Sequence, residues 1–176
     1  MSQKYIYLAS SWRNEHQPRV VNLLRDAGHQ VYDFRVPQRI IFPQGVPHSE
    51  KCSCARCSAG ERVGWPQLGE LASTGFSWKE VDPNYQSWTP SEYVAGLQHP
   101  RAQEGFTSDF NAMRWCDTCV CLMPCGPSAA LEAGWCKGSG RRLIVHVAGM
   151  REPDLMYSVA DKFTLTDEEL LQALKS

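Results

Sequence analysis

The apolar segment 117–123 is the feature of this sequence that most constrains its fold. It consists of Asp-Thr-Cys-Val-Cys-Leu-Met and ends at Pro124. A strand with one face in water alternates polar and apolar residues, whereas a nearly uninterrupted apolar run of this length predicts a strand that is covered on both faces. Both faces of a sheet are covered mainly when helices connect parallel strands. The segment therefore predicts an α/β protein with a parallel sheet.

Strand and helix patterns alternate on either side of this segment. Residues 4–9 and 29–34 are rich in β-branched and aromatic residues and predict two strands. Between them apolar residues recur at helical spacing from Val20 to Ala27, and Gly28 suits the end of that helix. Further helices are expected at about 89–97, 108–116 and 127–135 and from 166 onward, and further strands at 142–148 and 162–165. This order predicts a doubly wound sheet, in which ligands bind beyond the carboxyl ends of the strands.

The stretch from about residue 36 to 88 interrupts this pattern. It has no sustained helical or strand periodicity, and prolines break it at positions 37, 43, 47, 66 and 83. A compact domain rarely contains a structureless loop of this length, so we interpret the stretch as an insertion with short elements of its own. The chain of 176 residues suits one domain, residues 1–176, that carries this Cys/Pro-rich insertion.

Four potential metal ligands lie close together in the insertion: His48, Cys52, Cys54 and Cys57. A Cys-x2-Cys pair is half of a common zinc site, and a bound zinc would stabilise an irregular segment. The second Cys-x2-Cys pair of a common zinc site is missing, however, and a loop with reduced thiols is the alternative. The remaining cysteines, in the apolar last third of the chain, are interpreted as small residues at buried positions.

Composition and charge exclude several classes of protein. There are 18 Lys and Arg residues against 19 Asp and Glu residues, a net charge of -1, so a general nucleic-acid binder is not expected. No apolar run approaches the roughly 18 residues that a membrane helix needs. The N-terminus is too short and polar for a secretory signal, which predicts a cytoplasmic protein with thiols rather than disulfides.

Two strand ends carry the residues best suited to chemistry. The first strand ends at Ser10, Ser11, Trp12 and Arg13. The segment 117–123 ends in a turn that contains Gly126 and Ser128 and leads into a helix carrying Glu132.

A helix start binds anions, and Glu132 on the second turn can lean toward the same crevice. Asp109, near the start of its own predicted helix, could reach this crevice from the side. The alternatives are a solvated Glu132, a capping Asp109, and an Arg13 that covers apolar surface or pairs with Glu15.

At these positions the sequence resembles the nucleoside 2-deoxyribosyltransferase family. The resemblance rests on residues 6–12, on Asp109 eight residues before Asp117, on residues 126–134 and on the Asp-Leu-Met segment 154–156. It covers about residues 4–34 and 105–175, and the stretch 36–88 has no clear counterpart. It implies a flavodoxin-like doubly wound sheet.

The resemblance also implies a reaction. Glu132 matches the family's nucleophile, which attacks the anomeric carbon of a deoxyribose to form a glycosyl-enzyme intermediate. Asp109 would protonate the departing base, as in the two-carboxylate chemistry of retaining glycosidases. Tyr7 would orient Glu132, and Trp12 would offer a stacking face for the base. No cofactor is required.

The resemblance further implies a homodimer or a larger homo-oligomer. In the family a neighbouring subunit completes each pocket, and Asp154 and Met156 match the positions it contributes.

The family contains transferases that act on nucleosides and N-hydrolases that act on nucleoside 5′-monophosphates. Gly126 stands where the transferases have an acid, and Ser11-x-Arg13 resembles the phosphate-binding Ser-x-Arg of the hydrolases. Asp154 would repel a phosphate, and Trp12 resembles the transferases. The sequence favours the hydrolase branch.

Two other classes of protein fit the same pattern less fully. One is an NAD-cleaving or nucleotide-binding enzyme on a similar sheet, such as a Toll/interleukin-receptor-like domain or a lysine-decarboxylase-like nucleotide enzyme. The other is a sensor without activity whose insertion recruits a partner.

Overall fold

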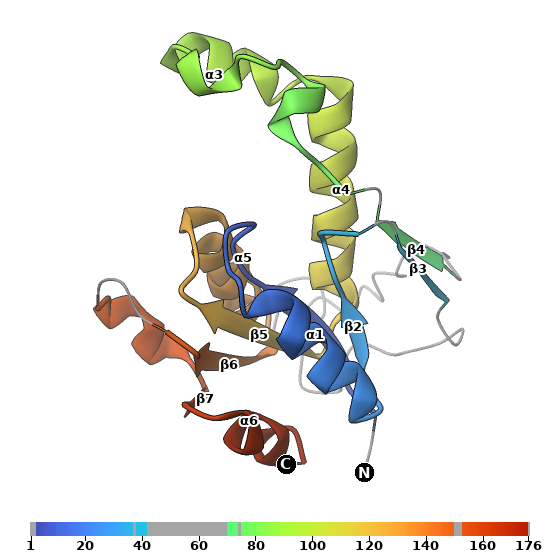
Figure 1. Ribbon diagram of the computed structural model, residues 1–176, viewed down its shortest axis with the longest axis vertical. Helices are drawn as coiled ribbons and strands as arrows, with labels where there is room; N and C mark the ends of the chain where they lie inside the picture. The colour runs from blue at the N-terminus through green and yellow to red at the C-terminus, as the bar shows by residue number, and fades with distance from the viewer. Residues whose placement is uncertain (1–2, 37, 42–69, 74, 150–152, 176) are drawn as a thin grey trace, which may run out of the picture.

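A five-stranded, entirely parallel sheet forms the centre of the molecule (Figure 1). The computed structural model describes residues 3–36, 38–41, 70–73, 75–149 and 153–175. The strands, in the order β2-β1-β5-β6-β7 across the sheet, are β2 (Gln30–Tyr32), β1 (Tyr5–Ala9), β5 (Thr118–Met123), β6 (Arg142–Val147) and β7 (Lys162–Thr164). This is the flavodoxin-like strand order, and it confirms the predicted α/β doubly wound fold.

Helices cover both faces of the sheet. Helices α1 (Gln17–Asp26) and α6 (Asp167–Ala173) contact one another on one face, and α4 (Pro100–Trp115) and α5 (Pro127–Gly138) contact one another on the other. The alternation of side chains along each strand divides the core accordingly. In β1, Ile6 and Leu8 face the α1/α6 layer, whereas Tyr7 and Ala9 face the α4/α5 layer.

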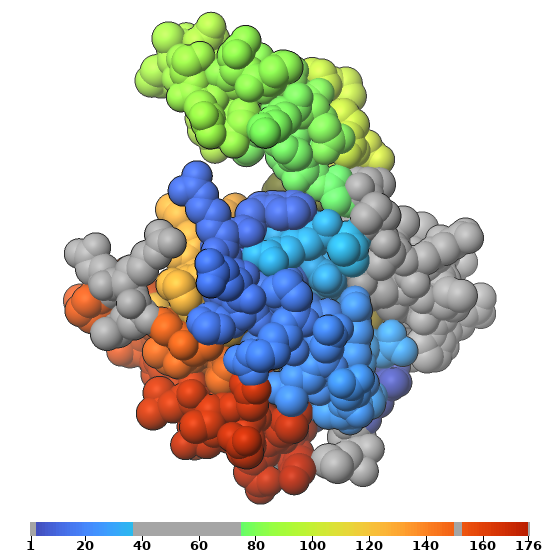
Figure 2. Space-filling model, viewed as in Figure 1, coloured from blue at the N-terminus to red at the C-terminus, as the bar shows by residue number. Residues whose placement is uncertain are grey.

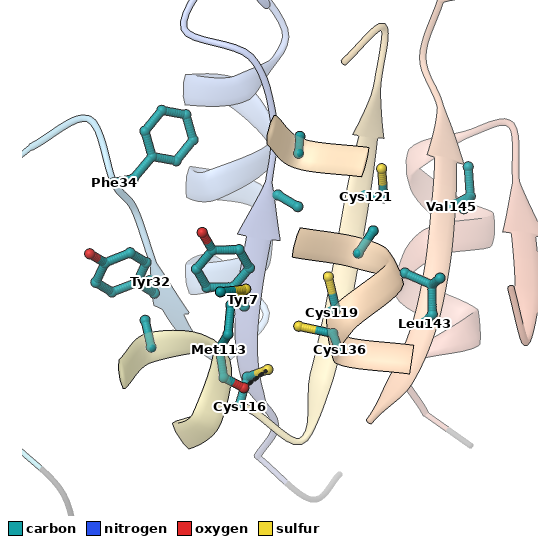
Figure 3. Packing of buried hydrophobic residues seen from close by; sticks show 14 of the residues in the cluster. Tyr7, Tyr32, Phe34, Met113, Cys116, Cys119, Cys121, Cys136, Leu143 and Val145 are labelled. Atoms are coloured by element: carbon teal, nitrogen blue, oxygen red, sulfur yellow. Dashed lines mark hydrogen bonds between the residues drawn. The ribbon is translucent and has the colours of Figure 1, made fainter. Parts of the chain in front are cut away.

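Helix α5 packs closely on β5 because the residues on both sides of this contact are small. On β5 this face carries Cys119 and Cys121, both fully buried (Figure 3). Helix α5 contributes Ala129 and Ala133 to the same cluster. Small side chains on both sides of an interface let a helix approach the sheet backbone, which places the second turn of α5 close to β1 and β5.

Helix α4 is longer than the sequence pattern predicts. We expected it to begin at about Ser108, but it begins at Pro100, and the His99 side chain accepts a hydrogen bond from the backbone N–H of Arg101. Its first turns bury only small residues, Ala102 and Gly105, so they lack the apolar periodicity that marks a helix. As a result Asp109 lies in the middle of the helix, and the alternative in which it caps the helix start is wrong.

The inserted stretch contains short elements of its own, as expected. Strands β3 (Gln38–Ile41) and β4 (Glu70–Ser73) form a separate antiparallel pair, and the 3-10 helices η1 (Trp78–Glu80) and η2 (Tyr85–Ser87) precede α3 (Pro90–Gly96). Figure 1 shows α3 at the end of α4 that is remote from the sheet. A further 3-10 helix, η3 (Leu155–Val159), lies between β6 and β7.

The proposed zinc ligands His48, Cys52, Cys54 and Cys57 lie outside the described residues. Within the described ranges, no group of three or more His, Cys, Asp or Glu side chains is placed to hold a metal ion. The same part of the chain contains no helix with the length and apolar character needed to cross a bilayer.

Candidate functional site

The candidate site lies where the chain changes direction across the sheet, at the carboxyl ends of β1 and β5. From β1 the chain continues to β2 on one side, and it later returns to β5 on the other side. The connections that leave these two strands therefore diverge and leave a crevice between them. The loop after β1 carries residues 10–14, and the turn after β5 leads into α5 at Gly126.

Two side chains hold the loop after β1 in place. The Arg35 guanidinium, just past β2, donates hydrogen bonds to the backbone carbonyls of Ser11, Trp12 and Asn14, at 3.0, 2.6 and 2.8 Å. The Asn14 amide in turn donates to the carbonyls of Leu122 and Pro124 at the end of β5. The loop is thus fixed to both neighbouring strands.

A small cavity, partly open to solvent, lies beside this loop. Three aromatic rings, those of Trp12, Phe34 and Phe76, form much of its wall, and Asp109 and Ser108 of α4 contribute polar groups. Trp12 and Phe34 pack edge to face with their ring centroids 5.1 Å apart. In Figure 2 the surface is hollowed between the green segment that leads into α3 and the blue loop after β1.

Gly105 of α4 also lines the cavity, and it approaches Phe76 so closely that a β-carbon would lie 2.9 Å from that of Phe76. The glycine therefore lets Phe76 sit against the helix.

Two stacked tyrosines lie at the base of the site. Tyr7 of β1 and Tyr32 of β2 are direct partners in the sheet register, and their rings stack with centroids 5.6 Å apart. Their hydroxyl groups lie on the same side of the two rings (Figure 3). The Tyr32 hydroxyl donates to Oδ1 of Asp109 at 2.8 Å and lies 2.9 Å from the hydroxyl oxygen of Ser108.

The Tyr7 hydroxyl is buried and has no partner at hydrogen-bonding distance among the described residues. An unpaired buried hydroxyl destabilises a protein by about 1–3 kcal/mol. Burial raises the pKa of this phenol well above 10, and the negative charges of Glu132 and Asp109 raise it further. The structure therefore brings Tyr7, Asp109 and Glu132 together.

Both carboxyl groups are difficult to ionise. Burial raises the pKa of Asp109 from 3.8 to about 6, and the hydrogen bond from Tyr32 opposes this rise. Burial also raises the pKa of Glu132 from 4.5 to about 7; the Asp109 charge adds to the rise, and the nearby Tyr7 hydroxyl opposes it. Paired carboxylates with raised pKa values beside a cavity are the usual arrangement for acid–base and nucleophilic chemistry.

The other predicted residues near the crevice are placed as follows. The Ser10 hydroxyl is buried without a partner among the described residues, and Ser11 Oγ accepts a hydrogen bond from the Arg13 backbone N–H. The Arg13 side chain is exposed and makes no ion pair within the described residues, so the alternative pairing with Glu15 is not formed. Gly126 precedes the first turn of α5 and has no side chain to accept a hydrogen bond from the backbone N–H groups of that turn, and Ser128 is exposed in the turn.

Asp154 and Met156 are not brought to the cavity of their own chain. Both lie at η3, where Asp154 caps the helix by accepting a hydrogen bond from the Met156 N–H at 2.8 Å. The Met156 side chain is 63% exposed, and that of Leu155 beside it is 79% exposed.

The sequence analysis missed Tyr32, Ser108, Phe34 and Phe76. Tyr32 could have been found, because it and Phe34 lie two residues apart in the segment 29–34 that was predicted as a strand, so both were expected on one face of the sheet. Phe76 lies in the inserted stretch, which has no periodicity to place it.

Comparisons with known proteins support the fold. No protein-family model and no curated protein matches the sequence. Among solved structures, the chain is similar to a 2-deoxyribosyltransferase from Bacillus psychrosaccharolyticus, with a TM-score of 0.52 and 16% identity over 94% of this chain and 89% of that one. It also matches a CMP N-glycosidase from Clostridium botulinum, with a TM-score of 0.42 and 13% identity over 97% and 98% of the two chains. The first structure bears the name of the family that the sequence motifs resemble.

The raised pKa of Glu132 has a consequence for stability. A carboxyl group whose pKa is raised by folding stabilises the protein below its unfolded-state pKa, and this contribution is lost as the pH rises through the folded-state pKa. The increase from 4.5 to about 7 corresponds to about 3 kcal/mol. We therefore expect Glu132→Gln to raise the free energy of unfolding by up to about 3 kcal/mol at pH 8 and hardly at all below pH 4.5.

Urea unfolding of the two proteins at both pH values measures this effect. Glu168→Gln, which removes an exposed carboxylate on α6, is the matched control for the loss of one negative charge. Equal stability of the wild type and Glu132→Gln at pH 8 would show that Glu132 ionises without penalty.

The hydrogen bond from Tyr32 predicts a second effect. Because this bond favours the ionised form of Asp109, Tyr32→Phe should raise the pKa of Asp109 by about one pH unit, while the stacked ring is retained. Carbon-13 NMR titration of the Asp109 carboxyl measures the change. Tyr5→Phe, which packs on Trp115 instead, is the control. An unchanged Asp109 pKa in Tyr32→Phe would contradict the positioning role of Tyr32.

Proposed function

We propose that this protein cleaves the N-glycosidic bond of a nucleoside or its 5′-monophosphate, with Glu132 as the nucleophile and Asp109 as the general acid. The observation that carries the proposal is the pair of partly buried carboxyl groups near the Tyr7 hydroxyl, one of which, Asp109, lines an aromatic cavity at the switch point of the sheet. These residues are also those on which the family resemblance rests, and the fold is shared with a protein named as a 2-deoxyribosyltransferase.

The aromatic cavity suits the heterocyclic base. Three of the residues that line it are aromatic, and their rings offer flat apolar faces of the kind that a heterocyclic base stacks on. A planar ring can stack on Trp12, Phe34 or Phe76. Asp109 in the wall would then face the base and could protonate a ring nitrogen as the glycosidic bond breaks.

In this arrangement the sugar lies toward Glu132. The Glu132 carboxylate attacks the anomeric carbon, the bond to the base breaks, and an ester between the sugar and Glu132 forms. Water or a second base then attacks the same carbon and releases Glu132. The Tyr7 hydroxyl, which has no other partner among the described residues, can hold the carboxylate in the attacking position.

The reaction requires Glu132 ionised and Asp109 protonated. Burial raises the pKa of Asp109 to about 6 and that of Glu132 to about 7, so the pair can hold a proton near neutral pH. A hydrogen bond from Tyr7 to the Glu132 carboxylate favours the productive state, because it stabilises the ionised form of Glu132.

The 5′-monophosphate is the favoured substrate. Arg13 is exposed and unpaired within the described residues, and Ser11, Ser128 and the uncapped N-terminal turn of α5 lie in the loops around the same crevice. An arginine, hydroxyl groups and helix N–H groups together provide the donors that a phosphate accepts.

We further propose that the protein is a homodimer or a larger homo-oligomer in which Asp154 and Met156 of a second copy complete the site. The exposure of Leu155 and Met156 supports this arrangement, because large apolar side chains gathered on a surface are typical of protein contacts.

The nucleophile can be tested directly. Glu132→Ala should lower kcat by about 10⁴-fold or more on any substrate that the wild type turns over, since loss of a nucleophile removes the covalent pathway. A panel of nucleosides, 5′-monophosphates and NAD, assayed for released base, identifies that substrate. A 2-fluorinated deoxyribosyl analogue should label Glu132, as detected by mass spectrometry of the intact protein and its peptides.

Glu104→Ala, on the exposed surface of α4, is the control for loss of a glutamate. Wild-type activity of Glu132→Ala would refute the proposal. Release of nicotinamide from NAD, without cleavage of nucleosides or monophosphates, would place the protein in the NAD-cleaving class instead.

If Arg13 binds the 5′-phosphate, its removal should lower kcat/KM for the monophosphate and not for the nucleoside. Removing a charge-assisted contact of about 1.5–3 kcal/mol lowers kcat/KM by about 10- to 100-fold. Arg13→Ala should show this loss on the monophosphate and little change on the unphosphorylated nucleoside. Arg13→Lys, which keeps the charge, should retain part of the preference. A wild-type preference for the unphosphorylated compound would refute the assignment to the hydrolase branch.

A further inference from the structure

Cys125 differs from the other cysteines that the structure describes. Cys116, Cys119, Cys121 and Cys136 are buried, with at most 4% exposure, as expected for small core residues. Cys125 lies in the turn between β5 and α5 and is only partly buried, so the interpretation as core filler does not hold for it. It is therefore within reach of small molecules in solution.

The Cys125 sulfur has two close polar neighbours. Its Sγ lies 3.7 Å from Sγ of Cys121 on β5 and 3.0 Å from the hydroxyl oxygen of Tyr157 on η3. Both neighbours can donate a hydrogen bond to a thiolate. The S–H of Cys121 lowers the pKa of Cys125 most, and the Tyr157 hydroxyl lowers it further. The same contact and burial raise the pKa of Cys121.

We propose that Cys125 is a site of reversible oxidation by hydrogen peroxide or a small hydroperoxide, with Cys121 as the thiol that resolves it into a disulfide. The proposal rests on an accessible sulfur held by two donors and on a second sulfur already within 3.7 Å of it. A disulfide bond is about 2.0 Å long, so the two sulfurs need to approach by less than 2 Å. The proposal does not depend on the glycosidic reaction.

The chemistry balances with one peroxide as the oxidant. The Cys125 thiolate attacks one peroxide oxygen; an S–O bond forms, the O–O bond breaks, and the other oxygen leaves as hydroxide and takes up a proton to become water. Cys125 is now a neutral sulfenic acid. Cys121 loses its proton to the departing hydroxyl group and attacks the Cys125 sulfur, so that an S–S bond forms and the S–O bond breaks, releasing a second water. Two thiols and one peroxide give one disulfide and two waters.

The difference in burial among the cysteines decides which of them reacts with peroxide. Thiolates react with peroxide and thiols do not, and the reaction also needs access. Cys125 has both properties. The buried Cys116, Cys119 and Cys136 form a second group of neighbouring thiols, and burial or their mutual contacts raise their pKa values. They should therefore stay reduced under conditions in which Cys125 reacts.

Peptide mapping of the native protein tests the proposal. The full chain is treated with a small excess of hydrogen peroxide, denatured, alkylated and cleaved with trypsin. All five described cysteines then lie in the peptide 115–137. We expect this peptide to carry three alkyl groups, on Cys116, Cys119 and Cys136, and to have a mass two hydrogens below that of the same peptide with its other two thiols free. Because a disulfide closes a ring, it should yield no backbone fragments from cleavage between residues 121 and 125. A reductant added before alkylation should restore all five thiols.

Three variants make the result specific. Cys121→Ser should stop the reaction at a sulfenic acid on Cys125, which dimedone traps, and Cys125→Ser should leave Cys121 reduced. Cys136→Ala, which changes a buried cysteine, should form the Cys121–Cys125 disulfide as the wild type does. The proposal is overturned if both thiols of the wild type remain free after peroxide treatment, or if Cys121 is oxidised equally in Cys125→Ser.

Discussion

The desolvation of two carboxyl groups around one tyrosine hydroxyl is the constraint on which the rest of this structure depends. Each raised pKa corresponds to about 3 kcal/mol at alkaline pH, and an unpaired phenol adds about 1–3 kcal/mol. A domain is stable by only about 5–15 kcal/mol. The two-sided apolar core must offset these terms, which explains why β1 and β5 are buried along nearly their whole length.

The site is assembled from three elements because none of them could hold both acids. Helix α5 starts at the carboxyl end of β5, so Glu132 on its second turn stays near that edge. Helix α4 approaches from the other direction and ends just before β5, so Asp109 lies partway along it. Tyr7 lies between them on β1, and its stacking partner Tyr32 bonds to Asp109. The pairing of Tyr7 with Tyr32 in the sheet thereby links β1 and β2 to Asp109 on α4.

The sheet and the places of Tyr7 and Glu132 on their elements could be predicted because local patterns encode them, whereas Asp109 was expected near a helix start and lies in the middle of α4. The apolar run at 117–123 and the alternation around Tyr7 are signals of period two, and the helix after Gly126 has clear boundaries. The start of α4 could not be predicted, because Ala102 and Gly105 pack through their small size. The cavity could not be predicted either. Phe76 reaches it from the inserted stretch, whose sequence has no helical or strand periodicity to show where its side chains lie.

The abundance of cysteine follows from the same packing that builds the site. Glu132 approaches Tyr7 only if α5 lies close to the sheet, and this requires small side chains at Ala129 and Ala133 and on the facing strand. On β5 those positions are Cys119 and Cys121. The turn that joins β5 to α5 carries Cys125, and its sulfur lies 3.7 Å from that of Cys121. The charge of Cys125 in turn contributes to the raised pKa of Glu132. The thiol pair and the carboxyl pair are therefore two results of one structural requirement, a helix of small residues packed against a strand of small residues.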